Sequence, residues 1–102
     1  MMKTTIEEKN GELVATFEGR LDTAASVQTA KDIEPLNLCP DGQVIILDCT
    51  RLEYLASSGL RLFIGVLKDA KPRGCKVYVK GLNKDLKSVF AMTGFIHLFE
   101  FK

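Results

Sequence analysis

The sequence lacks a long apolar run and an excess of either charge, and both shortages exclude classes of function. No stretch of the 102 residues approaches the roughly 20 consecutive apolar residues that a membrane span needs. The 14 basic and 13 acidic residues give a net charge of +1, which favours neither nucleic acid nor an anionic membrane as a partner. The N-terminus becomes acidic at Glu7 and Glu8 without an apolar segment, so we expect no secretory signal.

The sequence also has few cysteines, one histidine and neither of two common nucleotide-binding motifs. Cys39, Cys49 and Cys75 are odd in number and form no C-x-x-C spacing, which disfavours a disulfide framework and a zinc site. The one histidine, His97, lies between apolar neighbours, where we expect a packed strand histidine rather than a catalytic base. Neither G-x-x-x-x-G-K-S/T nor G-x-G-x-x-G occurs, so a nucleotide site has no support. These absences predict no metal and no cofactor, and they fit the reduced cytoplasm.

The sequence does contain enough apolar material for one core. Hydrophobic residues make up 46% of the chain, so we expect a single domain over residues 1–102. Two alternating segments, 3–9 and 12–18, flank Asn10-Gly11, which is a strong signal for a tight hairpin turn. The alternation of the second segment places that strand near a sheet edge.

After the hairpin, helical and extended patterns alternate, which predicts parallel pairing through right-handed crossovers. The first element expected is a helix that is capped by Asp22 or Thr23 and ends at Pro35, with Ala24, Val27, Ala30 and Ile33 on one side. A loop over 36–42 follows it, and then a central strand over 43–48 that is covered on both faces. Next come a helix over 60–70, which Pro72-Arg73-Gly74 stops, and a strand over 75–79. A third helix is capped within 81–83, ends at Gly94 and has Leu86, Val89 and Phe90 inward. A strand over 95–101 is the last element expected. The fold class is therefore α/β, a hairpin followed by a mixed, mainly parallel sheet.

The helix over 60–70 is apolar around more than half of its circumference. Only Arg61, Gly65, Lys68 and Asp69 form a polar side. Such a helix either packs against the sheet and a neighbouring helix, or leaves part of its apolar face for a partner. A monomer or a weak dimer is compatible with both alternatives.

Residues 48–59 connect the central strand to this helix and read as a loop at the carboxyl end of the strand. Ser57 and Ser58 lie at the helix start, where a serine is a preferred N-cap and one hydroxyl would remain spare. Loops after parallel strands share one edge of a sheet, so we expect residues 19–23, 49–59 and 80–83 to converge there. Thr23 and Thr50 would add hydroxyls, and Asp22 and Asp48 can approach each other as paired carboxylates, although capping is the more common use of Asp22.

The residues Ala56-Ser57-Ser58-Gly59-Leu60, set behind an apolar strand that ends at Asp48, resemble the signature of the STAS domain of bacterial anti-sigma factor antagonists. The segment 17–22 resembles the second motif of that family, and 92–95 resembles the third, so the resemblance covers nearly the whole chain. Phosphorylatable members usually carry aspartate before the acceptor serine, and this chain has Ala56 there.

The resemblance implies a STAS-like fold and a binding protein rather than an enzyme. Similar domains bind a serine kinase that doubles as an anti-sigma factor, and phosphorylation by that kinase switches them off until a phosphoserine phosphatase reverses it. The matching acceptor here is Ser57, with Ser58 as the fallback. The contacts carried over from the motif are Asp22, Thr23, Ser57, Ser58, Gly59 and Arg61. A phosphoryl group at a helix N-terminus would be tolerated by the free N–H groups there.

Two alternatives remain open from the sequence. Some similar domains serve as unphosphorylated adaptor subunits of transport complexes, and Ala56 is compatible with that function. A small hydrolase using Ser57 is less well supported, because the sequence places no base beside the serine.

Overall fold

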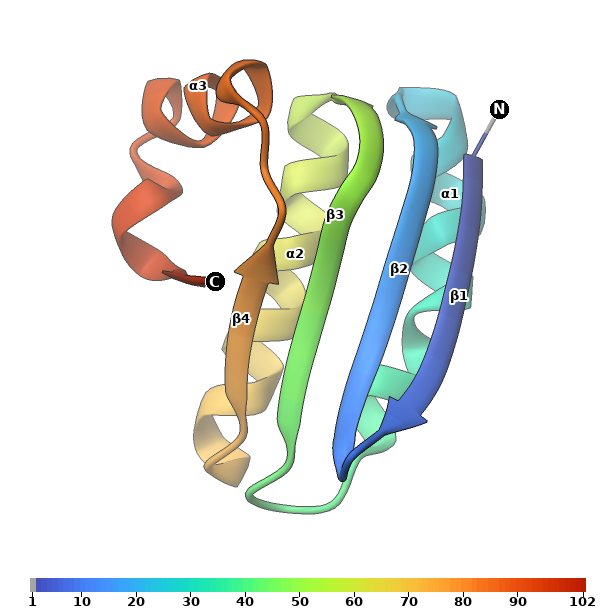
Figure 1. The fold of residues 1–102 in the computed structure, drawn as a ribbon, viewed down its shortest axis with the longest axis vertical. Helices are drawn as coiled ribbons and strands as arrows, with labels where there is room; N and C mark the ends of the chain where they lie inside the picture. The colour runs from blue at the N-terminus through green and yellow to red at the C-terminus, as the bar shows by residue number, and fades with distance from the viewer. Residues whose placement is uncertain (1) are drawn as a thin grey trace.

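The structure, a computed structural model, describes residues 2–102 as a mixed sheet with its helices gathered on one face (Figure 1). In the described residues the sheet has five strands in the order β1-β2-β3-β4-β5. Their bounds are β1 Met2–Lys9, β2 Glu12–Leu21, β3 Val44–Leu55, β4 Lys76–Lys80 and β5 Glu100–Phe101. Strands β1 and β2 pair antiparallel and all the other pairs are parallel, which confirms the predicted fold class.

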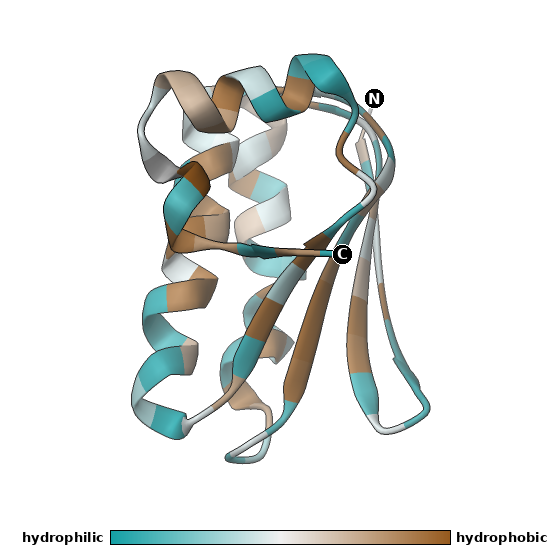
Figure 2. Cartoon of the chain, turned by 60° about the vertical axis from the view of Figure 1, so that its left-hand side comes forward, coloured by the Kyte–Doolittle hydropathy of each residue, from teal (hydrophilic) through white to brown (hydrophobic). Residues whose placement is uncertain are grey.

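The helices are α1 Thr23–Asp32, α2 Ser57–Ala70 and α3 Lys84–Met92, with short 3₁₀ segments η1 Glu34–Leu38, η2 Lys71–Arg73 and η3 Phe95–Leu98. All of them lie on the same side of the sheet (Figures 1 and 2). The prediction that β3 is covered by helices on both faces is therefore wrong. Ile46 points away from the helices and is still buried, because Val14 and Tyr78 flank it in the neighbouring strands. Its burial by the sheet itself explains why the sequence of β3 lacks alternation.

The hairpin is formed as predicted. Asn10 and Gly11 have φ angles of 53° and 79°, the left-handed conformation that a tight turn of this kind requires at both positions. Strand β1 forms the edge and β2 lies one strand in, between β1 and β3.

Helix α1 starts where it was predicted, and its predicted apolar side is correct at Ile33, which is buried, but wrong at Ala24 and Val27, which are exposed. Asp22 caps it, and its carboxylate accepts a hydrogen bond from the Ala25 N–H at 2.8 Å. Val27 is 69% exposed, whereas Ser26 and Thr29 are buried. The Ser26 hydroxyl donates to the Asp22 carbonyl oxygen at 2.8 Å, and this bond lowers the cost of burying it. Beyond α1, the predicted loop over 36–42 begins with η1, which buries Leu36.

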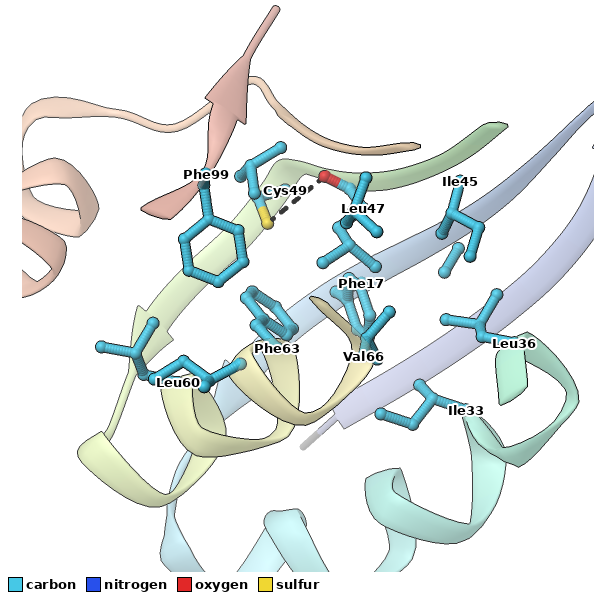
Figure 3. Packing of buried hydrophobic residues seen from close by; sticks show 14 of the residues in the cluster. Phe17, Ile33, Leu36, Ile45, Leu47, Cys49, Leu60, Phe63, Val66 and Phe99 are labelled. Atoms are coloured by element: carbon cyan, nitrogen blue, oxygen red, sulfur yellow. Dashed lines mark hydrogen bonds between the residues drawn. The ribbon is translucent and has the colours of Figure 1, made fainter. Parts of the chain in front are cut away.

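The core lies between the helices and the sheet, and a row of aromatic rings runs through it (Figure 3). Phe63 of α2 lies 5.0 Å from Phe17 and 6.4 Å from Phe90, measured between ring centroids. Phe90 and Leu86 of α3 are both buried, as predicted. The polar side of α2 is exposed and its apolar side packs against the sheet and α1, which confirms the first of the two alternatives for this helix.

The end of the chain differs from its prediction. The expected strand over 95–101 is a 3₁₀ turn followed by a strand of two residues, β5. His97 lies in that turn and is exposed, so it is not a packed strand histidine. Phe99 is buried and anchors the turn against Phe90 at a centroid distance of 5.4 Å. None of the helices among residues 2–102 could span a membrane.

Candidate partner-binding site

Strand β3 continues to Leu55 and α2 begins at Ser57, so the predicted loop over 48–59 and the predicted helix start at Leu60 are both wrong. The pairing with β2 shows the reason: Thr16 lies opposite Asp48, but Leu21 lies opposite Leu55, so β3 uses two more residues than β2 over the same length. Such β-bulges change the spacing of side chains that face one side of the sheet. Buried residues accordingly follow at intervals of three, at Cys49, Leu52 and Leu55, and the alternation typical of a strand is lost.

The longer strand separates Asp48 from the helix start. Seven residues of strand at about 3.3 Å each place Asp48 roughly 20 Å before Leu55. The carboxylate of Asp48 instead accepts two bonds from Thr50, from its N–H at 3.0 Å and from its hydroxyl at 2.7 Å. Burial alone would raise the pKa of Asp48, but these bonds and the charges of Lys80 and Lys9 together lower it. The predicted approach of Asp22 and Asp48 is therefore wrong.

The predicted convergence of three loops is correct for two of them. The starts of α1 and α2 meet, since the Ala56 N–H donates to the Leu21 carbonyl at 2.9 Å. The third loop lies against Thr50: a Cβ added at Gly81 would be 2.9 Å from the Thr50 Cα. Thr50 and residues 80–83 thus form a separate contact along β3.

Hydroxyl groups line the junction of α1 and α2. The Ser58 hydroxyl lies 3.1 Å from the Ser26 hydroxyl and donates to the Thr23 hydroxyl at 3.4 Å. Asp22 stands at the same junction as the cap of α1. The structure therefore brings Asp22, Thr23 and Ser58 together. Ser26 belongs to the same group and was missed, because the predicted face of α1 turned it outward.

Neither serine caps α2, contrary to the prediction. The N-cap is Ala56, whose side chain has no hydrogen-bonding atom, and Ser57 and Ser58 are the first two helical residues. The first bond within the helix is donated by the Leu60 N–H to the Ala56 carbonyl. The N–H groups of the first turn therefore receive no bond from a cap side chain, and they form the positive end of the helix dipole. Ser57 is exposed at this end, whereas Ser58 is half-buried.

Gly59 and Arg61 have different surroundings. Gly59 is buried, and a Cβ there would lie 2.7 Å from Leu21 Cγ and 2.9 Å from Leu55 Cδ1. It allows α2 to approach the ends of β2 and β3 and does not reach the surface. Arg61 is exposed and lines a groove of about 360 Å³ between α1 and α2.

His97, the one histidine of the sequence, lies far from Ser57. His97 lines a cavity together with Leu67 and Lys71, near the C-terminal end of α2. At about 1.5 Å per residue, Leu67 lies roughly 15 Å along the helix from Ser57. Among residues 2–102, no group of three or more His, Cys, Asp and Glu side chains could hold a metal ion. The junction presents an exposed hydroxyl, several hydroxyl neighbours and free helix N–H groups, a surface suited to polar recognition and to carrying an anion.

Comparisons with known proteins agree with this architecture. The family model described as STAS domain matches residues 3–102. The anti-sigma-B factor antagonist of Listeria monocytogenes is 29% identical over 100 residues, which cover 95% of this chain and 85% of the relative.

Two solved structures share the fold at 20% identity each. The anti-sigma factor antagonist from Mycobacterium paratuberculosis matches with a TM-score of 0.80, over 99% of this chain and 85% of that chain. The Bacillus cell fate determinant SpoIIAA in its phosphorylated form matches with a TM-score of 0.71, over 98% of this chain and 91% of that chain.

Proposed function

The chain belongs to the STAS domain family, and on that premise we propose that it acts as an anti-sigma factor antagonist in the cytoplasm. Residues 1–102 form its one domain in this proposal, and its partner is an anti-sigma factor that is also a serine kinase. The unmodified domain binds that kinase and thereby frees a sigma factor. Phosphorylation of Ser57 ends the binding, and a phosphoserine phosphatase restores it. The name of the Listeria relative supports the general function.

The observation that carries the proposal is the difference between the two serines. Ser57 is exposed, at the first position of α2. Ser58 is half-buried, and its hydroxyl is engaged with the hydroxyls of Ser26 and Thr23. A kinase must bring the acceptor oxygen into line with the γ-phosphate, which an exposed hydroxyl allows and a tethered one resists. Ser57 is therefore the acceptor in this proposal.

The phosphorylated domain would remain folded. A phosphoryl group on Ser57 adds a charge of about −1.5 to −2 beside the positive end of α2. Because Ala56 has no carboxylate, no like charge at the N-cap opposes it. The exposed charge would instead act on the partner, and each 1.4 kcal/mol of repulsion or desolvation lowers affinity about tenfold.

The partner contacts follow from the same junction. Asp22, Thr23, Ser57 and Ser58 lie around it, and Arg61 extends the surface along the exposed side of α2. Gly59 contributes by setting the position of the helix, since it is buried. Mutation of Gly59 would thus weaken binding through the fold, whereas mutation of Arg61 would remove a direct contact.

The test is phosphoryl transfer from labelled ATP in a lysate of the host, with the wild-type chain, Ser57→Ala and Ser58→Ala compared. We expect label on the wild type and on Ser58→Ala, and none on Ser57→Ala. The exposed position of Ser57 predicts a stability change within about 0.5 kcal/mol, so thermal unfolding of each variant separates loss of the acceptor from loss of the fold. Label on Ser57→Ala would contradict the assignment. No label on any chain, with the kinase active on a control substrate, would refute the switch and favour the adaptor alternative, which the absence of a carboxylate at Ala56 supports.

A further inference from the structure

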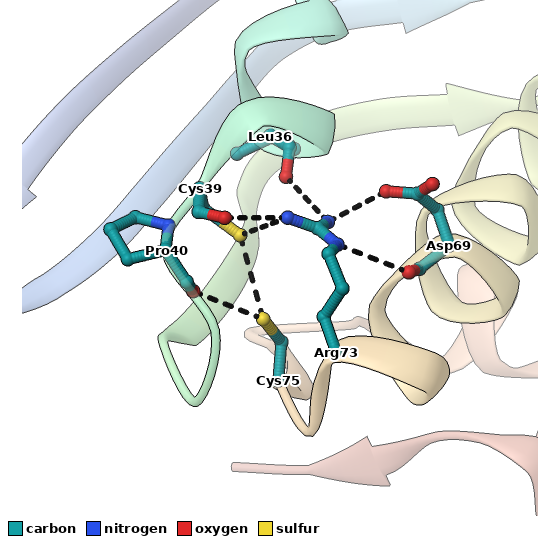
Figure 4. Close-up of polar contacts among 6 residues, drawn as sticks. All are labelled: Leu36, Cys39, Pro40, Asp69, Arg73 and Cys75. Carbon is teal, nitrogen blue, oxygen red and sulfur yellow. Dashed lines mark hydrogen bonds and ion pairs between the residues drawn. The ribbon is translucent and has the colours of Figure 1, made fainter.

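Two cysteines that are distant in the sequence lie side by side near the C-terminal end of α2. Cys39 follows η1 and Cys75 precedes β4, 36 positions later, and their sulfur atoms are 3.6 Å apart (Figure 4). Both are free thiols, and their exposed fractions are 6% and 8%. A disulfide bond has an S–S length of about 2.05 Å, so the two sulfur atoms need to approach by only about 1.5 Å.

Neighbouring groups hold both thiols in place. The Arg73 guanidinium donates to the Cys39 carbonyl at 2.6 Å and to the Cys39 sulfur at 3.3 Å, while Asp69 accepts from Arg73 at 2.6 Å. The Cys75 thiol donates to the Pro40 carbonyl at 3.4 Å. Burial and the neighbouring Cys75 raise the pKa of Cys39, and the charge of Arg73 partly opposes this effect. The pair is therefore positioned for a reaction that proceeds faster as pH rises, because the thiolate is the nucleophile.

A cavity lies beside one member of the pair. Cys75 lines a cavity of about 350 Å³, together with Lys71, Lys76 and His97. This volume far exceeds that of a hydrogen peroxide molecule, since a water molecule takes up about 30 Å³. Lys71, Lys76 and Glu100 give the cavity a charged, polar lining.

We propose that Cys39 and Cys75 form an oxidative modification site whose substrate is hydrogen peroxide and whose product is an intramolecular disulfide. The Cys75 thiolate attacks one peroxide oxygen, the O–O bond breaks, and water leaves after protonation. This step produces a sulfenic acid on Cys75. The Cys39 thiolate then attacks the Cys75 sulfur, the S–O bond breaks, and a second water leaves. In total, two thiols give up two electrons and two protons, and one peroxide becomes two waters.

The disulfide would strengthen the fold without blocking the junction of α1 and α2. The ring that it closes contains all of β3 and α2, so it restricts the unfolded chain strongly. Helix α2 has 14 residues and is about 21 Å long, which separates the cysteines from Ser57. We therefore expect the oxidised protein to melt roughly 10 °C or more above the reduced protein.

The test uses the full chain, reduced, freed of reductant and treated with one equivalent of hydrogen peroxide. After alkylation, mass spectrometry counts the remaining thiols and maps any disulfide. We expect the wild type to fall from three free thiols to one, with a peptide that joins Cys39 to Cys75. Cys49→Ala, the control, should form the same disulfide, whereas Cys39→Ser and Cys75→Ser should form none within the chain.

Three outcomes would overturn the proposal, and each is measured on the wild-type chain, so none depends on whether a cysteine variant folds. The first is a wild type that keeps all its thiols at a peroxide dose that oxidises the chain in guanidinium. The second is a disulfide that includes Cys49, and the third is an oxidised form that melts below the reduced one.

Discussion

Substitution of Gly59 by alanine tests how α2 is seated on the sheet. Gly59 lies in the first turn of α2 with ordinary helical geometry, so its backbone does not require glycine. The surroundings do. An added Cβ would lie 2.7 Å from Leu21 Cγ, 2.9 Å from Leu55 Cδ1 and 3.0 Å from Leu21 Cδ2. Both leucines are buried in the core, so they have little room to move.

Two opposing effects determine the size of the change. Alanine favours a helix over glycine by about 0.5–1 kcal/mol. Overpacking of a close-packed core costs about 1–3 kcal/mol. Two leucines must yield here, so the second effect is the larger one. We expect Gly59→Ala to lower the free energy of unfolding by about 1–2 kcal/mol, which is about 5–15 °C in Tm for a domain of this size.

Gly65 provides a matched control in the same helix. It is exposed, and a Cβ added there would meet no atom within 4 Å among the described residues. Gly65→Ala should therefore gain the helix preference alone and raise the free energy of unfolding by about 0.5–1 kcal/mol. The two substitutions are chemically identical and differ only in their surroundings.

Urea denaturation at pH 7, followed by circular dichroism, gives the free energy of unfolding of both variants. Opposite signs for Gly59→Ala and Gly65→Ala would support the close approach of α2 to Leu21 and Leu55. Equal stabilisation by both substitutions would refute it, because it would show that the start of α2 has room for a methyl group.

Three further changes have clear expected outcomes. Ala56→Asp should add the missing N-cap and raise stability by about 1 kcal/mol, and a lower Tm would contradict the placement of residue 56. Gly81→Ala should cost more than about 2 kcal/mol in urea denaturation, because φ is +77° and a Cβ would lie 2.9 Å from Thr50 Cα. The lowered pKa of Asp48 stabilises the fold above the unfolded value of 3.8, and this contribution is lost as pH falls through the folded-state pKa. Asp48→Asn should thus have a lower free energy of unfolding than the wild type at pH 7, and the gap between the two proteins should shrink below about pH 4. A gap of equal size at pH 7 and pH 3 would refute the stabilising effect of the Asp48 carboxylate.

Local signals in the sequence were sufficient for much of the fold. Asn10-Gly11 predicted the hairpin because few residues adopt positive φ at two successive positions. Asn83 caps α3 and its carboxamide accepts from the Leu86 N–H at 2.9 Å, as the predicted cap within 81–83 required. Gly94, with φ of 77°, follows the end of that helix. Each of these features depends on a few adjacent residues, so tertiary contacts did not override them.

The errors arose where distant contacts determine the local structure. Nothing in the sequence near Ser26 shows that its hydroxyl is satisfied by Asp22 and Ser58, so hydrophobicity placed Val27 inward instead. The nearness of Cys39 and Cys75 depends on how β4 pairs with β3, and the spacing of the cysteines along the chain contains no such information. The apolar neighbours of His97 predicted a packed strand histidine, but the residue lies in the turn before β5 and is exposed to solvent.

The extra length of β3 connects the largest error to the site. If β3 matched β2 residue for residue, Leu21 would lie opposite Glu53, and the helix start would come two residues too late to meet α1. The two additional residues place Leu55 opposite Leu21 and allow the Ala56 N–H to reach the Leu21 carbonyl. Ser58 then comes within reach of Thr23 and Ser26, and Ser57 faces solvent. The bulges interrupt the alternation by which β3 could have been predicted over its full length. They also place Ser58 in contact with other hydroxyl groups and leave Ser57 exposed, and the proposed phosphorylation depends on this difference.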